Sequence, residues 1–314
     1  MTQTFAILGS GMAALGAATA LAAEGVAATC YDKNAYYGGH TATFAHSNGF
    51  LFDDGPHLSF TKNTRIQELL AANVDGEYEQ VTARINNYWH GYWMAHPAQC
   101  NLHGLPPELI TNIVCDFVQA QQPSERPIGN YADWLEIAYG ATFARTFPMV
   151  YGLKYHTTPA ENMSTDWLGP RMYRPSLEEV LRGALSAAPQ TEMHYVTQFR
   201  YPTRGGFAAY LRPFAERADL RLSHRLVGLD PSRRELRFDN GSVTTYERVI
   251  SSIPLPDLVA CLVDAPDQVR AAATRLAFTT AVIVNLGIGR ADLSDVHISY
   301  VYDPDIPFAR VNFP

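Results

Sequence analysis

The sequence predicts an α/β protein that combines a Rossmann-like domain with a second domain of mixed α+β structure. Two observations carry this prediction. Residues 4–33 read as an apolar strand, a glycine turn, an alanine-rich helix and a second strand, which is the βαβ opening of a Rossmann-like sheet. A helix-rich stretch over 107–190 is followed by renewed strand periodicity.

The opening turn has the residue types that a dinucleotide pyrophosphate requires. Gly9 permits the tight turn, Gly11 leaves room for the phosphates beside the backbone, and Ala14 lets the helix pack close to the strand. The helix N-terminus adds free N–H groups and a positive dipole end. Asp32 follows Gly11 by 21 residues and ends the second strand, where a carboxylate accepts hydrogen bonds from ribose hydroxyls. A merely tight turn would leave Asp32 and the later Gly38-Gly39 pair unexplained, so we predict a dinucleotide site.

The bulk composition limits the partners of the chain. It has 314 residues, of which 47% are hydrophobic and 18% charged, and a net charge of −7. These values suit an ordinary globular protein of two domains, or of one domain with a large insertion. No basic run is present, so nucleic acid is not expected as a partner. The apolar N-terminal stretch is interrupted by glycines and lacks a preceding Lys or Arg. Neither a membrane span nor an export signal is therefore expected.

The cysteines and histidines indicate the compartment and argue against a metal site. The four cysteines are scattered and form no Cys-x-x-Cys motif, which is typical of free thiols in a reducing compartment and predicts a cytoplasmic protein. The histidines at 90, 96 and 103 have no carboxylate at ligand spacing, so no metal is expected. A homo-oligomer stays open.

The first part of the remaining chain is divided by turn and capping signals. A short strand and a Gly-Pro turn are expected over 49–60, a helix over 64–72 with Asn63 or Thr64 as its cap, and an aromatic-rich hairpin over 78–95. The stretch 107–190 reads as mainly helical, and one of its helices is expected to begin at Ser176, which has capping-box spacing to Glu179.

Strand signals dominate the part of the chain after 190. A helix is expected from Thr203 to about Arg217, and Asn240-Gly241 between two alternating runs predicts a hairpin turn. Strands are expected over 220–229, 235–239, 242–251, 278–289 and 296–302.

These motifs resemble the superfamily of FAD-dependent amine oxidases and protoporphyrinogen oxidases. In that superfamily a Gly pair follows the acid of the second strand after five or six residues, as Gly38 follows Asp32 here. Nicotinamide-binding Rossmann domains usually lack this pair, so the resemblance implies FAD as the cofactor. The run Tyr151-x-x-Lys154 is similar to a motif of the UDP-galactopyranose mutase-like branch. Further similar segments are Tyr201-Pro202-x-x-Gly205-Gly206, 226–229 and 249–254.

The resemblance implies a domain division and a set of cofactor contacts. The FAD-binding domain, of glutathione reductase type, is expected over 1–75 and 191–265, and a discontinuous substrate domain over 76–190 and 266–314. Members of the superfamily usually continue into a further segment that touches the flavin, whereas this sequence stops at Pro314 and is expected to lack it. The implied FAD-binding positions are Gly9, Ser10, Gly11, Met12, Ala13, Asp32, Lys33, Gly39, His40, Thr41, Gly55, Pro56, His57 and Val227.

Two histidines are candidates for contact with the cofactor, each with a plainer alternative. His40 either bonds phosphate or flavin, or lies on the surface. Gly55-Pro56-His57 is expected to pass close to the flavin ring, where His57 would donate to the flavin or the substrate. The alternative is a tight turn with a solvated histidine.

The candidates for the substrate side are aromatic and basic residues. Tyr151, Lys154, Arg171 and Arg174 are expected to line it and to favour an anionic small molecule, because Arg presents a bidentate fork to phosphate. The alternative is a set of ordinary helix-end charges. The aromatic residues of 89–93 are expected in the core rather than in a substrate platform. His57, Lys154 and Arg171 are the catalytic candidates.

The resemblance implies an FAD-dependent oxidoreductase, in which the flavin accepts a hydride at N5 from a C–N or C–C bond. Two alternatives stay open. One is a mutase-like flavoenzyme that acts on a UDP-sugar with no net redox change, and the other is a non-catalytic or truncated dinucleotide-binding module.

Overall fold

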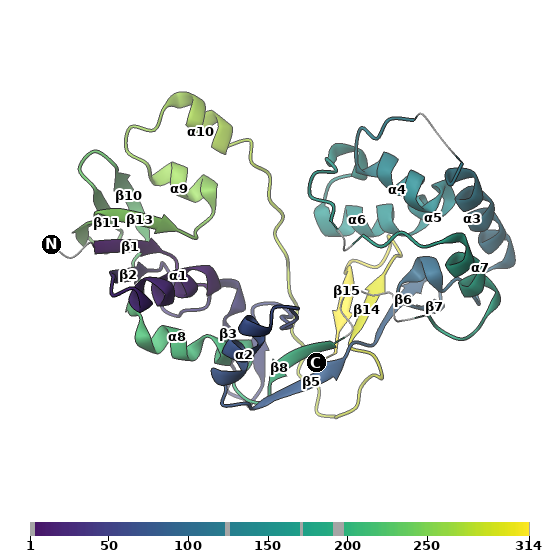
Figure 1. Ribbon diagram of the computed structural model, residues 1–314, viewed down its shortest axis with the longest axis horizontal. Coiled ribbons are helices and arrows are strands. Elements are labelled where there is room, and N and C mark those ends of the chain that lie inside the picture. The colour runs from purple at the N-terminus through teal and green to yellow at the C-terminus, as the bar shows by residue number, and fades with distance from the viewer. Residues whose placement is uncertain (1–3, 123–125, 170–171, 191–197, 314) are drawn as a thin grey trace. The chain divides into compact units, whose positions relative to one another are not determined.

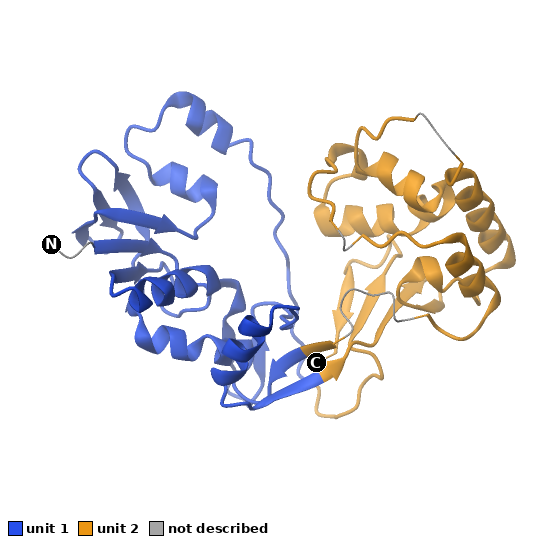
Figure 2. Cartoon of the chain, viewed as in Figure 1, with its two compact units in different colours: residues 1–80, 200–287 blue, residues 81–199, 288–314 orange. Residues whose placement is uncertain are grey.

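The structure is a computed structural model that describes every residue except 1–3, 123–125, 170–171, 191–197 and 314 (Figure 1). The chain divides into two compact units (Figure 2). Unit 1 comprises residues 1–80 and 200–287, and unit 2 comprises residues 81–199 and 288–314. Residues 266–287, which the sequence assigned to the substrate domain, cluster with unit 1 instead. Within them, the helix at 267–273 packs on the helix at 255–261.

A parallel four-stranded sheet forms the centre of unit 1. Its strand order is β13 (Arg248–Ser251), β1 (Thr4–Leu8), β2 (Ala27–Tyr31) and β9 (Asp219–Arg221). The central strand β1 is buried at Ala6, Ile7 and Leu8, as an apolar strand between parallel neighbours should be. Helix α1 (Met12–Ala23) packs on the sheet through small side chains such as Ala14 and Ala18. This confirms the predicted strand–helix–strand opening and the α/β fold class.

The other elements of unit 1 surround this sheet. Asn63 caps α2 by accepting a hydrogen bond from the backbone N–H of Ile66, as predicted. The expected strands 220–229 and 242–251 are each divided in two. The elements are η1 (Gly39–Thr41), β3 (Thr43–Ala45), β4 (Leu51–Asp53), α2 (Thr64–Ala72), η4 (Phe207–Tyr210), α8 (Arg212–Arg217), β10 (Leu226–Asp230), β11 (Glu235–Phe238), β12 (Val243–Thr245), α9 (Leu255–Cys261) and α10 (Asp267–Ala273). The strands β5 (Tyr78–Thr82) and β8 (Gln198–Pro202) pair with each other, and each has residues in both units.

The strand predicted over 278–289 does not form. In Figure 1 this segment follows α10 as an extended trace without an arrow. Its apolar side chains lie largely in solvent, with Phe278 80% and Val282 88% exposed. A strand needs a neighbour to satisfy its backbone N–H and C=O groups, and within the described residues no strand pairs with it. The sequence pattern is that of a strand, but none of the strands that the structure describes pairs with it.

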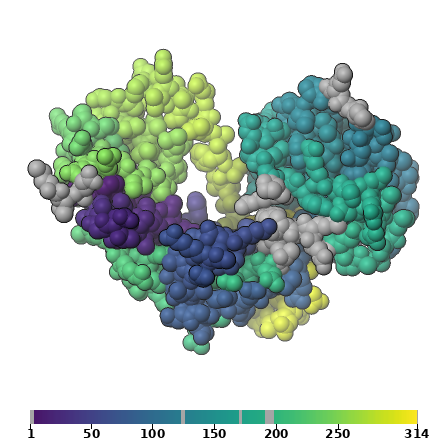
Figure 3. Space-filling model, in the orientation of Figure 1, coloured from purple at the N-terminus to yellow at the C-terminus, as the bar shows by residue number. Residues whose placement is uncertain are grey.

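Unit 2 combines a mixed sheet with a layer of helices. The sheet has the order β15 (Arg310–Asn312), β14 (Ile298–Val301), β6 (Ile85–Trp89) and β7 (Tyr92–Ala95), and β6–β7 is the predicted hairpin. The side chains of the helical layer form one continuous teal surface in Figure 3. The helices are η2 (Ala98–Cys100), α3 (Pro107–Ala120), α4 (Tyr131–Tyr139), α5 (Ala141–Thr146), α6 (Pro148–His156), η3 (Ala160–Asn162) and α7 (Leu177–Leu185).

The helical layer encloses the largest apolar core of the described residues. Leu102, Leu135 and Phe147 have no exposed surface there, and Trp89 of the hairpin packs against them. The predicted capping box at the start of α7 is present, with Ser176 and Glu179 bonded reciprocally. The aromatic stretch 89–93 is divided, since Trp89 packs on the core whereas Trp93 is 59% exposed.

Candidate cofactor-binding site

The glycine turn begins at the carboxyl end of β1, which is the edge where open α/β sheets bind ligands. The N–H of Gly9 donates to the carbonyl of Tyr31 in β2 (2.8 Å). Gly9 has a φ of +108°, and a Cβ at this position would lie 2.3 Å from the Oγ of Ser252, just beyond β13. Both the backbone conformation and the close approach of β13 therefore require glycine here.

The second glycine pair lies directly against the first turn. The N–H of Gly38 donates to the carbonyl of Ser10 (2.9 Å), and Gly38 also forms an isolated β-bridge with Gly11. A Cβ on Gly39 would lie 3.2 Å from the Cα of Gly11. Two segments that lie 27 residues apart in the sequence thus form one surface of bare backbone.

The N-terminus of α1 opens onto this surface without a cap. Gly11 is the N-cap residue and makes no side-chain hydrogen bond, and the first turn of α1 contains no acidic residue. The first N–H groups of a helix have no intrahelical partner, so they are donors for an anion. The exposed Met12 and Ala13 belong to this turn. The free N–H groups, the positive end of the α1 dipole and the glycine backbone without side chains together fit the diphosphate of FAD.

Asp32 is buried at the end of β2 and braces the turn. Its Oδ2 accepts hydrogen bonds from the N–H (2.8 Å) and the hydroxyl (2.7 Å) of Ser10, and its Oδ1 accepts from the N–H of Asn34 (2.8 Å). A carboxylate has about four acceptor positions, so one on Oδ1 is left for a ribose hydroxyl. The side chain of Ser10 is fully buried and serves Asp32, whereas Lys33 is exposed beside them.

Val227 lies at an irregularity of β10. The pairing of β10 with β11 shifts register between Leu226 and Gly228, so Val227 is the extra residue of a β-bulge and stands outside the ladder. Its side chain is 53% exposed. The extra residue of a bulge is left unpaired, so the backbone of Val227 is available to a ligand.

His224 is a neighbour of this site that the sequence analysis missed. Its backbone N–H donates to the carbonyl of Asp32 (2.7 Å), and its ring contacts Tyr31 and Phe238. It follows the carboxyl end of β9, so the sheet edge places it next to Asp32. No local signal in the sequence pointed to it, because His224 comes next to Asp32 only through the pairing of β9 with β2.

The histidine after the second glycine pair and the threonine beside it have different surroundings. The side chain of His40 is 98% exposed, and its Nδ1 lies 3.9 Å from a carboxylate oxygen of Asp54. Thr41 instead donates its hydroxyl to the carbonyl of Gly38 (2.7 Å) and so holds the glycine pair in place. Both alternatives for His40 stay open.

The Gly55-Pro56-His57 segment is a tight turn after β4. Gly55 has a φ of +98° and is buried, whereas Pro56 is exposed. The Nδ1 of His57 lies 2.8 Å from the carbonyl oxygen of Gly55. A carbonyl only accepts, so this nitrogen carries the proton, and Nε2 is an acceptor in the neutral ring. Neutral His57 would therefore accept from a ligand at Nε2, and only its protonated form would donate there.

The described substrate-side candidates belong to unit 2 and already contact other protein groups. The ammonium of Lys154 donates to the carbonyls of Val301 (3.1 Å) and Asp303 (2.9 Å), and burial lowers the pKa of Lys154. The guanidinium of Arg174 stacks on the ring of Trp134 (4.7 Å). Arg171 lies outside the described residues.

Tyr151 is likewise surrounded by protein. Its ring contacts those of Tyr155, Tyr300 and Tyr302, and burial raises the pKa of its hydroxyl. Packing therefore accounts for Tyr151 in the described structure, as it does for the aromatic core around it.

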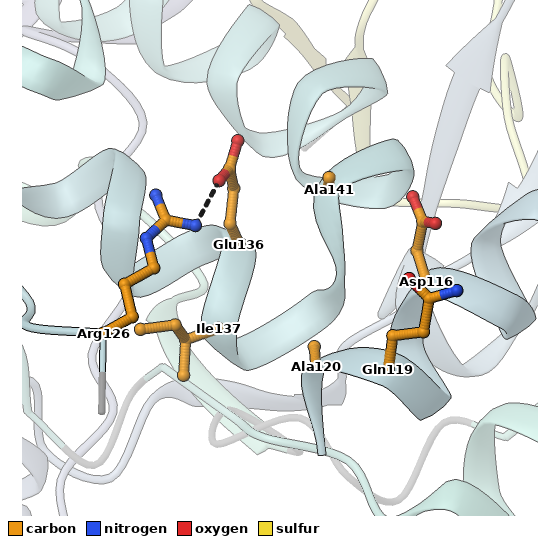
Figure 4. Close-up of a pocket in the computed structure, with 7 residues that line it drawn as sticks. All are labelled: Asp116, Gln119, Ala120, Arg126, Glu136, Ile137 and Ala141. Atoms are coloured by element: carbon orange, nitrogen blue, oxygen red, sulfur yellow. Dashed lines mark hydrogen bonds and ion pairs between the residues drawn. The ribbon is translucent and has the colours of Figure 1, made fainter. Parts of the chain in front are cut away.

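A cavity of about 250 Å³ lies between α3, α4 and α5 of unit 2 and contains none of the predicted site residues. Figure 4 shows the guanidinium of Arg126 joined to Glu136, and Arg126 also pairs with Asp133. Within the described part of the chain no group of three His, Cys, Asp or Glu residues is arranged to hold a metal ion. No helix there is long and apolar enough to cross a membrane.

Solved structures share this fold. Reduced UDP-galactopyranose mutase is 23% identical, with a TM-score of 0.88 over 98% of this chain and 69% of that one. A protein of Exiguobacterium sp. 255-15, assigned as a protoporphyrinogen oxidase, is 18% identical with a TM-score of 0.69, over 99% of this chain and 72% of that one. A cofactor-binding redesign of putrescine oxidase is 17% identical with a TM-score of 0.56, over 87% and 64%.

Two family models match the chain. The NAD(P)-binding Rossmann-like domain matches residues 7–72, which contain both glycine segments and Asp32. The flavin containing amine oxidoreductase matches residues 149–300. This match supports FAD as the cofactor and a flavin oxidoreductase type of enzyme. Together the matches confirm the predicted resemblance of this chain to the superfamily of FAD-dependent amine oxidases and protoporphyrinogen oxidases.

Proposed function

We propose that this chain binds FAD at the carboxyl edge of the unit 1 sheet and oxidises a small molecule. The observation that carries the proposal is that the turn Gly9–Gly11 and the pair Gly38–Gly39 are held together by backbone contacts beside the buried Asp32. FAD, when bound, supplies the ring that accepts a hydride at N5 from a C–N or C–C bond. The protein supplies binding, orientation and electrostatics.

The residues of unit 1 divide the binding work between them. The N–H groups at the start of α1 hold the diphosphate, and the free acceptor of Asp32 takes a ribose hydroxyl. The bulged backbone at Val227 meets the adenine. Gly55 lets the chain approach the flavin ring, and His57 faces it with Nε2.

An absorption spectrum tests the cofactor directly. The purified chain, incubated with FAD and then freed of excess, should absorb between about 350 and 500 nm, where the flavin ring absorbs. A colourless protein that also gains no colour from added FAD contradicts the proposal and favours a non-catalytic module. Equilibrium titration should give a Kd in the micromolar range or below, about −8 kcal/mol or stronger.

A mutase-like reaction on a UDP-sugar is the second candidate. It is favoured by the TM-score of 0.88 to reduced UDP-galactopyranose mutase, against 0.69 and 0.56 for the two oxidase structures. Turnover of UDP-galactopyranose only after reduction with dithionite would support the mutase. Consumption of oxygen or another acceptor with an organic substrate would support the oxidoreductase.

A further inference from the structure

A second carboxylate of unit 1 joins the segments around the proposed flavin half of the site. Asp53 ends β4, two residues before Gly55. Its Oδ1 accepts hydrogen bonds from the hydroxyl of Thr43 (2.6 Å) and the N–H of Phe207 (3.1 Å), and its Oδ2 accepts from the hydroxyl of Tyr201 (2.6 Å). One side chain thus holds residues that are 10, 148 and 154 positions away in the sequence.

The backbone at residues 206–208 packs closely against this carboxylate and against Thr43. The hydroxyl of Thr43 donates to Asp53 and accepts from the N–H of Ala208 (3.0 Å). Gly206 has a φ of +67°, and a Cβ there would lie 2.3 Å from Thr43 Cγ2 and 2.8 Å from Asp53 Oδ1. The turn before Phe207 therefore lies directly on the Thr43–Asp53 pair.

The hydrogen bonds of Asp53 are linked to His57, the residue proposed to face the flavin, through the ring of Phe207. Phe207, whose N–H is held by Asp53, contacts the ring of His57 with centroids 5.4 Å apart. Burial, and then the hydrogen bond to Asp53, raise the pKa of Tyr201. The hydroxyl of Tyr201 therefore keeps its proton and donates to Asp53. The hairpin β3–β4 itself begins just after the second glycine pair, at Thr43.

We propose that Asp53 is a positioning residue that sets the flavin half of the site, while the turn at Gly11 and Asp32 hold the nucleotide half. This inference rests on the proposed function, because it assumes FAD at the sheet edge. It assigns separate side chains to the two halves of one cofactor. The two halves should therefore respond separately to mutation.

The neighbouring Asp54 provides a matched control. Its side chain is 43% exposed, and its carboxylate has a distant contact with His40 (3.9 Å). Asp54 is the same residue type, one position along the same turn, yet it takes no part in the Asp53 network. Asp54→Asn removes the same charge without touching Thr43, Tyr201 or Phe207.

The experiment compares two ligands that share the nucleotide half. FAD contains both halves, whereas ADP lacks the riboflavin part, so their Kd values separate the two contributions. Asp53→Ala should raise the Kd of FAD about ten-fold, because Thr43, Tyr201 and Phe207 lose their shared acceptor, and should leave that of ADP within about two-fold. Tyr201→Phe should act in the same direction by about three-fold. Asp54→Asn should change neither ligand.

The visible circular dichroism of bound FAD gives a readout that a merely structural role would not move. Asp53→Asn keeps the side-chain shape and should retain FAD, but with an altered flavin band. If Asp53→Ala fails to fold, Asp53→Asn and Tyr201→Phe carry the test. Equal losses for FAD and ADP, or no loss for either, would overturn the inference. A wild-type chain that binds ADP but not FAD would instead overturn the proposed function itself.

Discussion

The two units differ in the material from which their predicted sites are made. In unit 1 the glycine turn, the second glycine pair and the start of α1 offer backbone groups, and the side chains of Ser10 and Asp32 brace them. In unit 2 the predicted side chains of Lys154 and Tyr151 already have protein partners. A site built from backbone demands particular residue types, whereas a lysine or tyrosine has many structural uses. The following experiments test this contrast.

The largest expected effect is on the backbone-built site. Gly11→Val places a branched side chain where the diphosphate must approach, and should weaken FAD binding at least about 1,000-fold, or ~4 kcal/mol. Titration with FAD measures this. Gly16→Val is the matched control in the same helix, because a Cβ at Gly16 meets nothing within 4 Å. Unchanged FAD affinity in the Gly11 variant would show that the turn is not the phosphate site.

Gly206→Ala should lower the stability of unit 1, and the added methyl group contacts Thr43 and Asp53 rather than the proposed FAD-binding residues. The strained φ and the contacts of the new Cβ with Thr43 and Asp53 should reduce the free energy of unfolding by about 3 kcal/mol. Gly241→Ala is the control, since its φ of +82° is similar but a Cβ there is in open space, and it should cost about 1 kcal/mol. Urea unfolding measures both, and equal losses would contradict the role of the contacts.

Lys154→Met tests whether the role of Lys154 in unit 2 is structural or catalytic. Two carbonyls lose their donor, so the free energy of unfolding should fall by about 1–3 kcal/mol. The exposed Lys33→Met should leave stability unchanged. A Lys154 variant of normal stability that binds FAD but has no turnover would break the contrast and place Lys154 in the chemistry.

The smallest effect is the pH dependence of unit 2. Burial, and then nearby Arg84, lower the pKa of His297 from 6.5, and its neutral Nδ1 accepts from the N–H of Arg84 (3.0 Å). A depressed folded pKa means that this contribution is complete above the unfolded value and is lost as the pH falls through the folded value.

Urea unfolding at about pH 7.5 and 5.5 measures this dependence. The wild type should be less stable at the lower pH, and His297→Gln should reduce the difference. The exposed His103→Gln is the control, and an equal effect of both variants would show that the Arg84–His297 contact is not the cause.

The sequence was most informative where a single residue type is physically required. The turn at Gly9 was predicted from the glycine itself, and the structure shows that a positive φ and the nearby Ser252 exclude a side chain there. The caps at Ser176 and at Asn63, the latter one of two candidates, were predicted because such side chains replace missing backbone acceptors. Elements defined by local chemistry are therefore readable from one sequence.

The sequence was least informative where the outcome depends on a distant partner. The pattern at 278–289 predicts a strand, but no described strand pairs with it. The role of Asp53 was missed, because nothing in the local sequence indicates its hydrogen bonds to Tyr201 and Phe207. Likewise His224 becomes a neighbour of Asp32 only through the pairing of β9 with β2.

The uncovered run at 276–288 has a consequence for handling this chain in solution. It contains no charged residue between Arg275 and Arg290, and Val282, Val284 and Leu286 are each at least 74% exposed. Extended apolar segments with unsatisfied edges serve as templates for aggregation, and Lys, Pro or a charge within the run suppresses it. A net charge of −7 spread over other surfaces does not protect this one. A single Val284→Lys substitution should therefore reduce aggregation of the chain more than several charges added elsewhere on the surface.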